Sequence, residues 1–482
     1  MIAPTALRTA PLGPKLVAML RSRAFLSAFA TLVFFTALAG DAWRNTISWL
    51  GWGILAAAIV GLSVALLISR RRDLRPHTLP YPLLAFLVLA TASIAWSAYP
   101  SWTALGSLAQ WASTAVAVAM ALLLDWRGLL RALSRAIAYI LGLSLLFELV
   151  VAAFVRQPVF AFWTDWELGE VPVMYQWSRA LLFEGGPIQG IVGNSSTLGF
   201  IAMLGVIVFT ILCVVRTDEP DPVIPQDADA LTRRRHIINA LIGVGVSFVV
   251  LLLTASATIA VTLVAVAIMA GLVLVMHRIL PGAPRAIAYV AAAAVLAGIV
   301  AAGLAFRDTI LALLGKSSDL TGRLDIWQAV ADVAAQRPVG GWGWVSYWVP
   351  WVEPFDSTIR IVRNGTQQLH AHNAWLDVSL QLGVIGVIVF AALIVSTFTR
   401  AWFIALDGVG APRRYTRALS MLPLLLLTAL LVQSVAESRI LVEYGWLLLA
   451  YIAVSTRALP VSADSVASLA GATRSVIEPR LN

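Results

Sequence analysis

Long apolar runs alternate with short polar segments along most of this chain. A helix that crosses a bilayer needs roughly 20 predominantly apolar residues, because lipid offers no partner for backbone polar groups. Twelve runs of about that length can be distinguished between residues 24 and 457. The pattern predicts an all-α, polytopic membrane protein of about 12 transmembrane helices. The runs lie at about 24–40, 49–69, 82–98, 103–124, 129–155, 188–215, 237–253, 257–277, 285–305, 373–399, 418–433 and 439–457.

Composition supports a membrane location. The chain is 60% hydrophobic and only 12% charged, more apolar surface than a water-soluble protein can bury. Its one cysteine, Cys213, lies inside an apolar run and cannot form an internal disulfide. The first run follows a basic stretch, as in a signal peptide, but we expect an uncleaved anchor because eleven further runs follow it.

The basic residues predict the orientation of the helices. If the helices alternate in direction, 24 of the 34 Lys and Arg residues fall on the side of the N-terminus. Cytoplasmic segments carry such an excess, so both termini are expected in the cytoplasm, with the protein in the inner membrane. The net charge of +9 is therefore attributed to membrane topology and not to binding of nucleic acid.

This orientation divides the chain into four parts. Helices one to nine occupy residues 1–305, an extracytoplasmic loop occupies 306–372, helices ten to twelve occupy 373–457, and a cytoplasmic tail occupies 458–482. A second long outside loop is expected at 156–187. Loops of this length within a compact fold are usually functional or disordered. The abundance of Trp and Gly in the 306–372 loop favours a functional one.

An amphipathic helix is predicted at 322–336, inside the larger loop. Leu324, Trp327, Val330 and Val333 recur at helical spacing, and a tight glycine turn follows Pro338. Arg323 lies in the first turn, where its guanidinium either contacts water and lipid phosphate or forms a fork for a substrate pyrophosphate. The neighbouring tryptophans either belong to an interfacial belt or provide platforms for sugar rings. They are Trp327, Trp342, Trp344, Trp348 and Trp351.

Two histidines stand directly before the tenth apolar run. His370 and His372 are the two histidines expected outside, and Asn373 after them is suited to cap the helix. A helix N-terminus favours anions and keeps a nearby imidazole neutral, so this turn is either a site of proton transfer or a polar cap without chemistry. Because we find no matching Asp, Glu or Cys cluster in the sequence, no metal is expected.

Charged residues also occur in or at the ends of the apolar runs. Glu148, Glu437, Arg439 and Glu443 are expensive at such depth, so each indicates either function or structural ion pairing. Glu437 and Arg439 are expected near the outer mouth, at the height of the histidines. The sequence contains no phosphate-binding loop, dinucleotide fingerprint or zinc-protease motif, and no cofactor is expected.

Three segments together resemble the O-antigen ligase and polymerase superfamily, most closely its exopolysaccharide-production polymerases. They read TGRLDIW at 321–327, RPVGGWGWVSYW at 337–348 and HAHNAWLDVSLQLGVIG at 370–386. GIVGNSSTLG at 190–199 resembles a second block of that family. The resemblance implies a C-type glycosyltransferase fold and a glycan donor on polyprenyl pyrophosphate at the outer leaflet. It also implies a glycan or lipid acceptor and surrounding membrane lipids as partners.

The resemblance further implies roles for individual residues. His372, which directly precedes Asn as in the family motif, would orient or deprotonate the acceptor hydroxyl, and His370 is a weaker catalytic candidate. Arg323 would hold the pyrophosphate. The candidate substrate-binding residues are Arg323, Asn373, Trp327, Arg179, Arg360, Arg363 and Glu437.

Two departures from the family pattern stand out. The turn at 254–258 lacks the arginine that ligases often carry, and Ser195 and Ser196 stand where the family often has Pro-Asn or Lys-Asn. Arg179, Arg360 or Arg363 could supply the missing charge. These departures favour a polymerase over a ligase. A transporter or flippase of lipid-linked sugars is the alternative from another class, and an inactive scaffold is a third.

Overall fold

The computed structural model describes residues 22–70, 79–170, 172–218, 230–279, 323–357, 366–407 and 417–457, with a few isolated positions between 284 and 298 and between 359 and 363. Regular structure in these residues is almost entirely helical, as predicted. Two short strands, β1 (Val362–Arg363) and β2 (Thr366–Gln367), form one antiparallel pair. The predicted ninth span at 285–305 falls largely outside the described residues, and the 458–482 tail does so entirely.

Within the described residues, eight helices are long and apolar enough to cross a membrane, and two shorter apolar stretches, Arg23–Leu38 and Tyr81–Ala95, accompany them. The chain is therefore a multi-pass membrane protein. The helices of the bundle are α2 (Arg23–Leu38), α3 (Gly40–Ser69), α4 (Tyr81–Ala92), α5 (Pro100–Leu123), α6 (Trp126–Val150), α7 (Ser195–Asp218), α8 (Ala230–Thr254), α9 (Ala257–Met276), α13 (Ala374–Asp407), α14 (Arg417–Ser434) and α15 (Glu443–Arg457).

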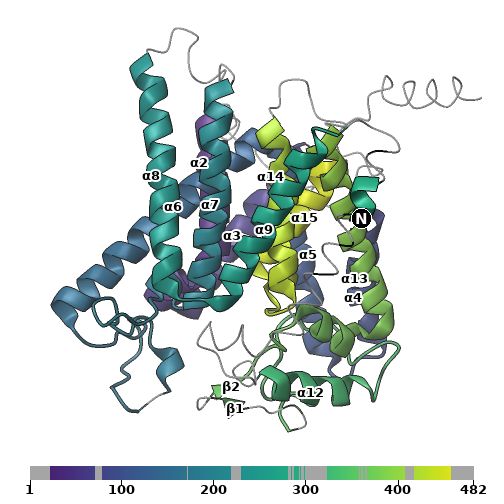
Figure 1. Cartoon of the computed structure of the whole chain (residues 1–482). Helices are drawn as coiled ribbons and strands as arrows, with labels where there is room; N and C mark the ends of the chain where they lie inside the picture. Colours follow the sequence, from purple (N-terminus) through teal and green to yellow (C-terminus); the bar gives the residue numbers. More distant parts are fainter. Residues whose placement is uncertain are drawn as a thin grey trace, which may run out of the picture.

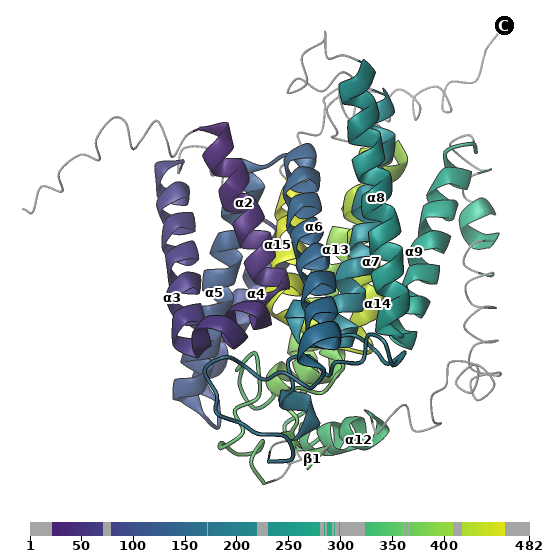
Figure 2. The same cartoon turned by 90° about the vertical axis from the view of Figure 1, so that its left-hand side faces the viewer.

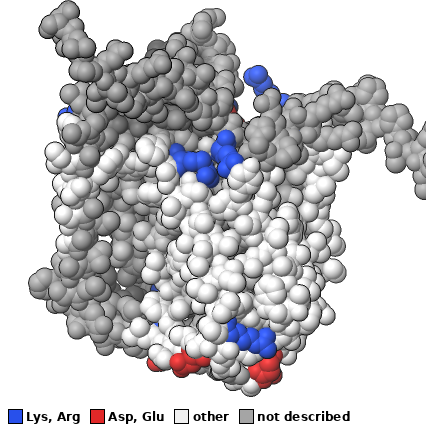
Figure 3. Space-filling view, turned by 90° about the vertical axis from the view of Figure 1, so that its right-hand side faces the viewer, with Lys and Arg blue, Asp and Glu red and all other residues white. Residues whose placement is uncertain are grey.

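The helices stand side by side in one bundle (Figure 1). α14 and α15 are buried along almost their whole length and form its centre, packed on α13, α7 and α5. α3, α8 and α9 lie at the rim, and only 17%, 28% and 28% of their respective spanning residues are buried. In Figure 3 the coloured side chains gather near the two ends of the face, and a belt without charge lies between them. That distribution is what a bilayer requires.

Several element boundaries differ from the predicted runs. The expected loop between the first two runs is helical, because α3 begins at Gly40 and breaks only at Ser48, whose φ is +68°. α6 continues into a π-helical turn at Val151–Val155. Short 3₁₀ turns precede two helices: Gly190–Val192 before α7, and Arg439–Leu441 before α15. The sequence runs missed these turns because they are as apolar as the helices they join.

The 156–187 loop and the described part of the 306–372 loop lie at the same end of the bundle, and α12 (Arg323–Ala334) lies across that end (Figures 1 and 2). α12 confirms the predicted amphipathic helix, with one correction to its buried face. Ile326, Val330 and Val333 are buried, whereas Leu324 is 43% exposed. The face is thus rotated from the predicted one, since it packs on α13.

α13 breaks at Gly383, where φ is +63° and ψ is −163°. The turn after Pro338 fills the break: Trp342 N–H donates to Leu380 O at 3.0 Å, and Val384 N–H donates to Pro338 O at 2.8 Å. The interrupted helix therefore keeps partners for its backbone, as irregular backbone next to lipid must. This pairing joins the loop that follows α12 to the helix that follows the histidines.

Gly383→Ala should lower the yield of folded protein severalfold. A Cβ at this position would lie 2.2 Å from Val339 O, and the backbone conformation is one that side chains rarely adopt. Strain of this kind costs on the order of 1–3 kcal/mol. Gly271→Ala, on the rim helix α9 with nothing within 4 Å of the added Cβ, is the matched control. Fluorescence-detected size exclusion of both variants checks this, and equal yields would contradict it.

Candidate active site

The turn before α13 places the two histidines. Asn373 caps the helix as predicted, since its Oδ1 accepts hydrogen bonds from the N–H groups of Trp375 at 3.0 Å and Leu376 at 3.3 Å. His372 just before it has a φ of +49°, in the left-handed region. A residue other than glycine is uncommon there and is held by its surroundings, which is frequent at functional sites.

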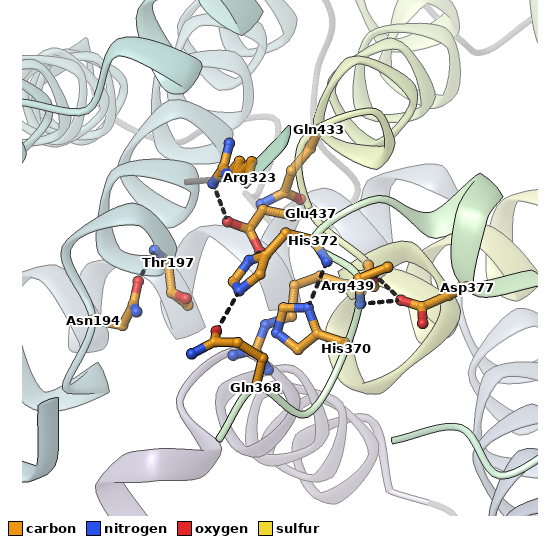
Figure 4. Close-up of polar contacts among 12 residues, drawn as sticks. Asn194, Thr197, Arg323, Gln368, His370, His372, Asp377, Gln433, Glu437 and Arg439 are labelled. Carbon is orange, nitrogen blue, oxygen red and sulfur yellow. Dashed lines mark hydrogen bonds and ion pairs between the residues drawn. The ribbon is translucent and has the colours of Figure 1, made fainter. Parts of the chain in front are cut away.

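The His372 ring lies between two oxygen atoms from different parts of the chain (Figure 4). Its Nδ1 is 3.1 Å from Oε2 of Glu437, and its Nε2 is 3.0 Å from Oε1 of Gln368. Glu437 follows α14 and is 65 residues from His372 in the sequence. Figure 4 shows the three side chains in a row, with the imidazole in the middle.

The state of Glu437 decides which ring nitrogen of His372 carries the proton. Burial acts to raise the pKa of Glu437, but the hydrogen bond to His372 and the nearby charges outweigh it and hold the pKa at about 2. The carboxylate is therefore ionised and can only accept, so Nδ1 of His372 is the donor in this contact. In a neutral imidazole with its proton on Nδ1, Nε2 presents a lone pair. Gln368 can meet that lone pair with its amide N–H₂, since the two ends of an amide are interchangeable by rotation.

Glu437 also binds Arg323. Its other oxygen, Oε1, is 2.8 Å from Nη2 of Arg323, and both side chains are mostly buried, with 13% and 19% of their surfaces exposed. One carboxylate thus joins the imidazole and the guanidinium. A guanidinium has five N–H donors, so this contact leaves Arg323 with capacity for a second anion.

His370 is arranged differently from His372. Its Nδ1 accepts the backbone N–H of His372 at 3.1 Å, and the two rings are 4.1 Å apart. Burial, and to a smaller extent the neighbouring His372, lowers the pKa of His370 to about 3. His370 is therefore neutral, and because Nδ1 is an acceptor, Nε2 carries the proton. This geometry makes His370 a hydrogen-bond donor toward its surroundings rather than a base.

The structure supplies the carboxylate that we did not find in the sequence. The ligand atoms of His370, His372 and Glu437 all lie within 4.8 Å of one another, a set of residue types that zinc can use. The hydrogen bonds do not suit a metal, because Nδ1 of His370 accepts the His372 N–H and Nδ1 of His372 contacts Glu437, so neither nitrogen faces an open ligand position. Binding an ion would require loss of protons and of both contacts. The arrangement is better suited to proton transfer.

A second charged network adjoins the histidines. Arg439 donates to Tyr347 Oη and to Glu443 Oε2, both at 2.7 Å, and Arg44 reaches Glu443 Oε1 at 3.1 Å. The Tyr347 ring lies 6.2 Å from that of His370. This confirms ion pairing for Arg439 and Glu443. Arg44 and Tyr347 were missed, although Arg44 was visible as a charge beside an apolar run.

The remaining candidates differ in what their described contacts show. Trp327 donates from its indole N–H to Ala371 O at 3.1 Å and so holds the histidine turn. Trp344 and Trp348 are buried core residues, so neither the belt nor the sugar-platform interpretation fits them. Arg179 follows Ser178, whose hydroxyl binds Glu148 Oε2 at 2.8 Å. Arg360 lies outside the described residues, as does the side chain of Arg363.

Glu148 is structural in its contacts. Its Oε1 accepts the N–H groups of Gln189 at 2.9 Å and Gly190 at 2.7 Å, which fixes the turn before α7. That turn leads to Asn194, whose Oδ1 caps α7 by accepting Thr197 N–H at 3.0 Å (Figure 4). The block that resembles a second family motif is therefore an ordered helix start.

Comparison with known proteins supports the resemblance to the O-antigen ligase and polymerase superfamily. Residues 240–391 match the family model described as O-antigen ligase, a stretch that contains Arg323 and the histidine turn. The resemblance to the O-antigen ligase and polymerase superfamily is thereby confirmed. The chain is also similar to the exopolysaccharide production protein ExoQ of Rhizobium meliloti, with 31% identity over 111 residues. That match covers 22% of this chain and 26% of the relative's length.

The partly buried, neutral His370 predicts a pH dependence of stability. Its pKa is about 3 in the folded protein and 6.5 when unperturbed, so below pH 6.5 the unfolded chain binds a proton that the folded protein does not. The contribution of His370 to the free energy of unfolding is fully present above pH 6.5 and decreases as the pH falls below 6.5. Between pH 7 and pH 5 the loss amounts to about 2 kcal/mol.

His370→Asn removes this term, since an Asn oxygen can replace Nδ1 as the acceptor. The free-energy advantage of the wild type over His370→Asn should therefore shrink between pH 7 and pH 5, measured by denaturation in detergent. Glu437 does not interfere, because its pKa is lowered from 4.5 and its term appears only below that pH. A pH-independent difference would contradict the neutral state of His370.

Proposed function

We propose that this protein is a glycosyltransferase that polymerises polyprenyl-pyrophosphate-linked polysaccharide, or transfers it, at the outer face of the cytoplasmic membrane. The observation that carries the proposal is the His372–Glu437 dyad, in which one carboxylate joins the imidazole to the guanidinium of Arg323 while Nε2 of the imidazole faces Gln368. A base next to a cation suits attack by a hydroxyl with departure of a phosphate. The similarity to an exopolysaccharide production protein supports this substrate class.

In the proposed reaction the acceptor hydroxyl takes the place of Gln368 at Nε2 of His372. The hydroxyl oxygen forms a bond to the anomeric carbon of the donor while its proton passes to Nε2. The bond between the anomeric carbon and the phosphate oxygen breaks, and polyprenyl pyrophosphate leaves with both bonding electrons. The carboxylate of Glu437 stabilises the imidazolium that results.

Arg323 is proposed to bind the pyrophosphate. Glu437 takes one N–H of the guanidinium at Nη2, and the other N–H donors can take a phosphate oxygen, which a planar fork suits better than an ammonium does. The roles of Asn373 and Trp327 follow from their contacts: both hold the histidine turn and need not touch substrate. No residue in this scheme requires a cofactor.

The main test concerns His372. His372→Ala should lower the rate of glycan transfer by roughly 10²–10⁴, the usual value of general acid–base catalysis by one side chain. His372→Gln should not restore it, because an amide cannot accept the proton. His277→Ala, at the C-terminal end of α9, is the matched control. The readout is chain length and release of polyprenyl pyrophosphate with purified protein and lipid-linked oligosaccharide. Wild-type rates in His372→Ala would refute the assignment.

The location of the site is proposed from the positive residues. The end of the bundle with α12 and the 156–187 loop holds the minority of the Lys and Arg residues, so it is expected to face away from the cytoplasm. A phosphatase reporter fused after Asp165 should therefore be active, and one fused after Arg235 should be inactive. The reverse pattern would place the histidines in the cytoplasm and exclude an outer-leaflet donor.

A further inference from the structure

Asp377 lies one turn into α13, behind the histidine turn, and 1% of its surface is exposed. Its Oδ1 accepts the indole N–H of Trp348 at 2.8 Å. Its Oδ2 accepts the backbone N–H of Ala371 at 3.1 Å and also the hydroxyl of Ser438. A buried carboxylate is expensive unless its lone pairs are satisfied, and three donors from three segments satisfy this one.

Two of these three donors stand next to a member of the dyad in the sequence. Ala371 stands between His370 and His372, and Ser438 stands between Glu437 and Arg439. Oδ2 of Asp377 therefore holds the two sides of the His372–Glu437 contact on one atom. Ala371 is fully buried, and its carbonyl is held by Trp327, so its peptide groups have partners on both sides.

We propose that Asp377 is a positioning residue, which sets the distance between His372 and Glu437 without touching substrate. The proposal rests on the proposed function, since it concerns the dyad that performs the transfer. The reaction rate depends strongly on the position of a reacting group, and a shift of about 1 Å can lower it about 10²-fold. The tripod of contacts made by Asp377 is the restraint that joins the histidine turn to the segment after α14.

An amide cannot replace this carboxylate. Asn at position 377 presents one oxygen and one N–H₂ group, so the N–H₂ must face either Trp348 or the pair of Ala371 and Ser438. The less costly choice turns it toward Trp348, where two donors meet. Removing the indole N–H relieves that clash. Trp348→Phe does so and keeps the stacking on Phe355, whose ring lies 5.7 Å from that of Trp348 at 20°.

The experiment compares four purified proteins with lipid-linked oligosaccharide as donor: wild type, Asp377→Asn, Trp348→Phe and the double variant. Asp377→Asn should lower kcat about 10- to 100-fold and leave KM for the donor within about twofold. Trp348→Phe alone should stay near the wild type. The double variant should regain most of the loss, which a merely structural defect would not do. Asp332→Asn on α12, which changes a carboxylate bound to Gln328, is the control.

Wild-type kcat in Asp377→Asn, or a double variant no better than Asp377→Asn, would overturn the proposal. If Asp377→Asn does not fold, Ser438→Ala replaces it: it removes one donor from the tripod on the Glu437 side and should lower kcat severalfold with KM unchanged. An unaffected kcat there would overturn the proposal as well. Failure of the proposed function is distinct, since the wild type would then form no glycosidic bond at all.

Discussion

Backbone polar groups that are not hydrogen-bonded within a helix must find other partners in the protein where they lie beside lipid. This requirement determines the structure at the end of the bundle that carries the histidine turn. α13 is interrupted at Gly383, and the turn after Pro338 supplies the missing partners. The turn before α7 is held by the carboxylate of Glu148. The histidine turn is held by Asn373, Trp327 and Asp377. Irregular backbone therefore occurs where another turn of the backbone or a buried side chain can satisfy it.

The charged side chains of the site also find their partners within the protein. Glu437 pairs with both Arg323 and His372, and Glu443 pairs with both Arg439 and Arg44. Charges that leave water need close partners, so each carboxylate serves two cations or a cation and an imidazole. A donor pyrophosphate would join an arrangement that is already balanced, and it would gain most from a guanidinium with unused donors. Arg323 meets that condition better than the doubly paired Arg439.

Much of the fold and part of the site were predictable from the sequence. Hydrophobic runs of bilayer length identified the spanning helices, and helical spacing identified α12, because both patterns follow from local geometry. Asn373 was recognisable as a cap for the same reason. The pairing of Glu437 with His372 across 65 residues was not predictable, since it depends on how α14 packs against α13. Asp377 gave no signal, because an acidic residue in a first turn normally faces water.

The proposed function requires that the protein makes glycosidic bonds and does not carry lipid-linked sugars across the membrane. Purified protein in liposomes, given a labelled lipid-linked oligosaccharide, distinguishes the two. We expect longer glycans to form together with polyprenyl pyrophosphate in equal amounts, and we expect His372→Ala to stop both. Movement of the label between leaflets without any longer glycan or free pyrophosphate lipid would contradict the account.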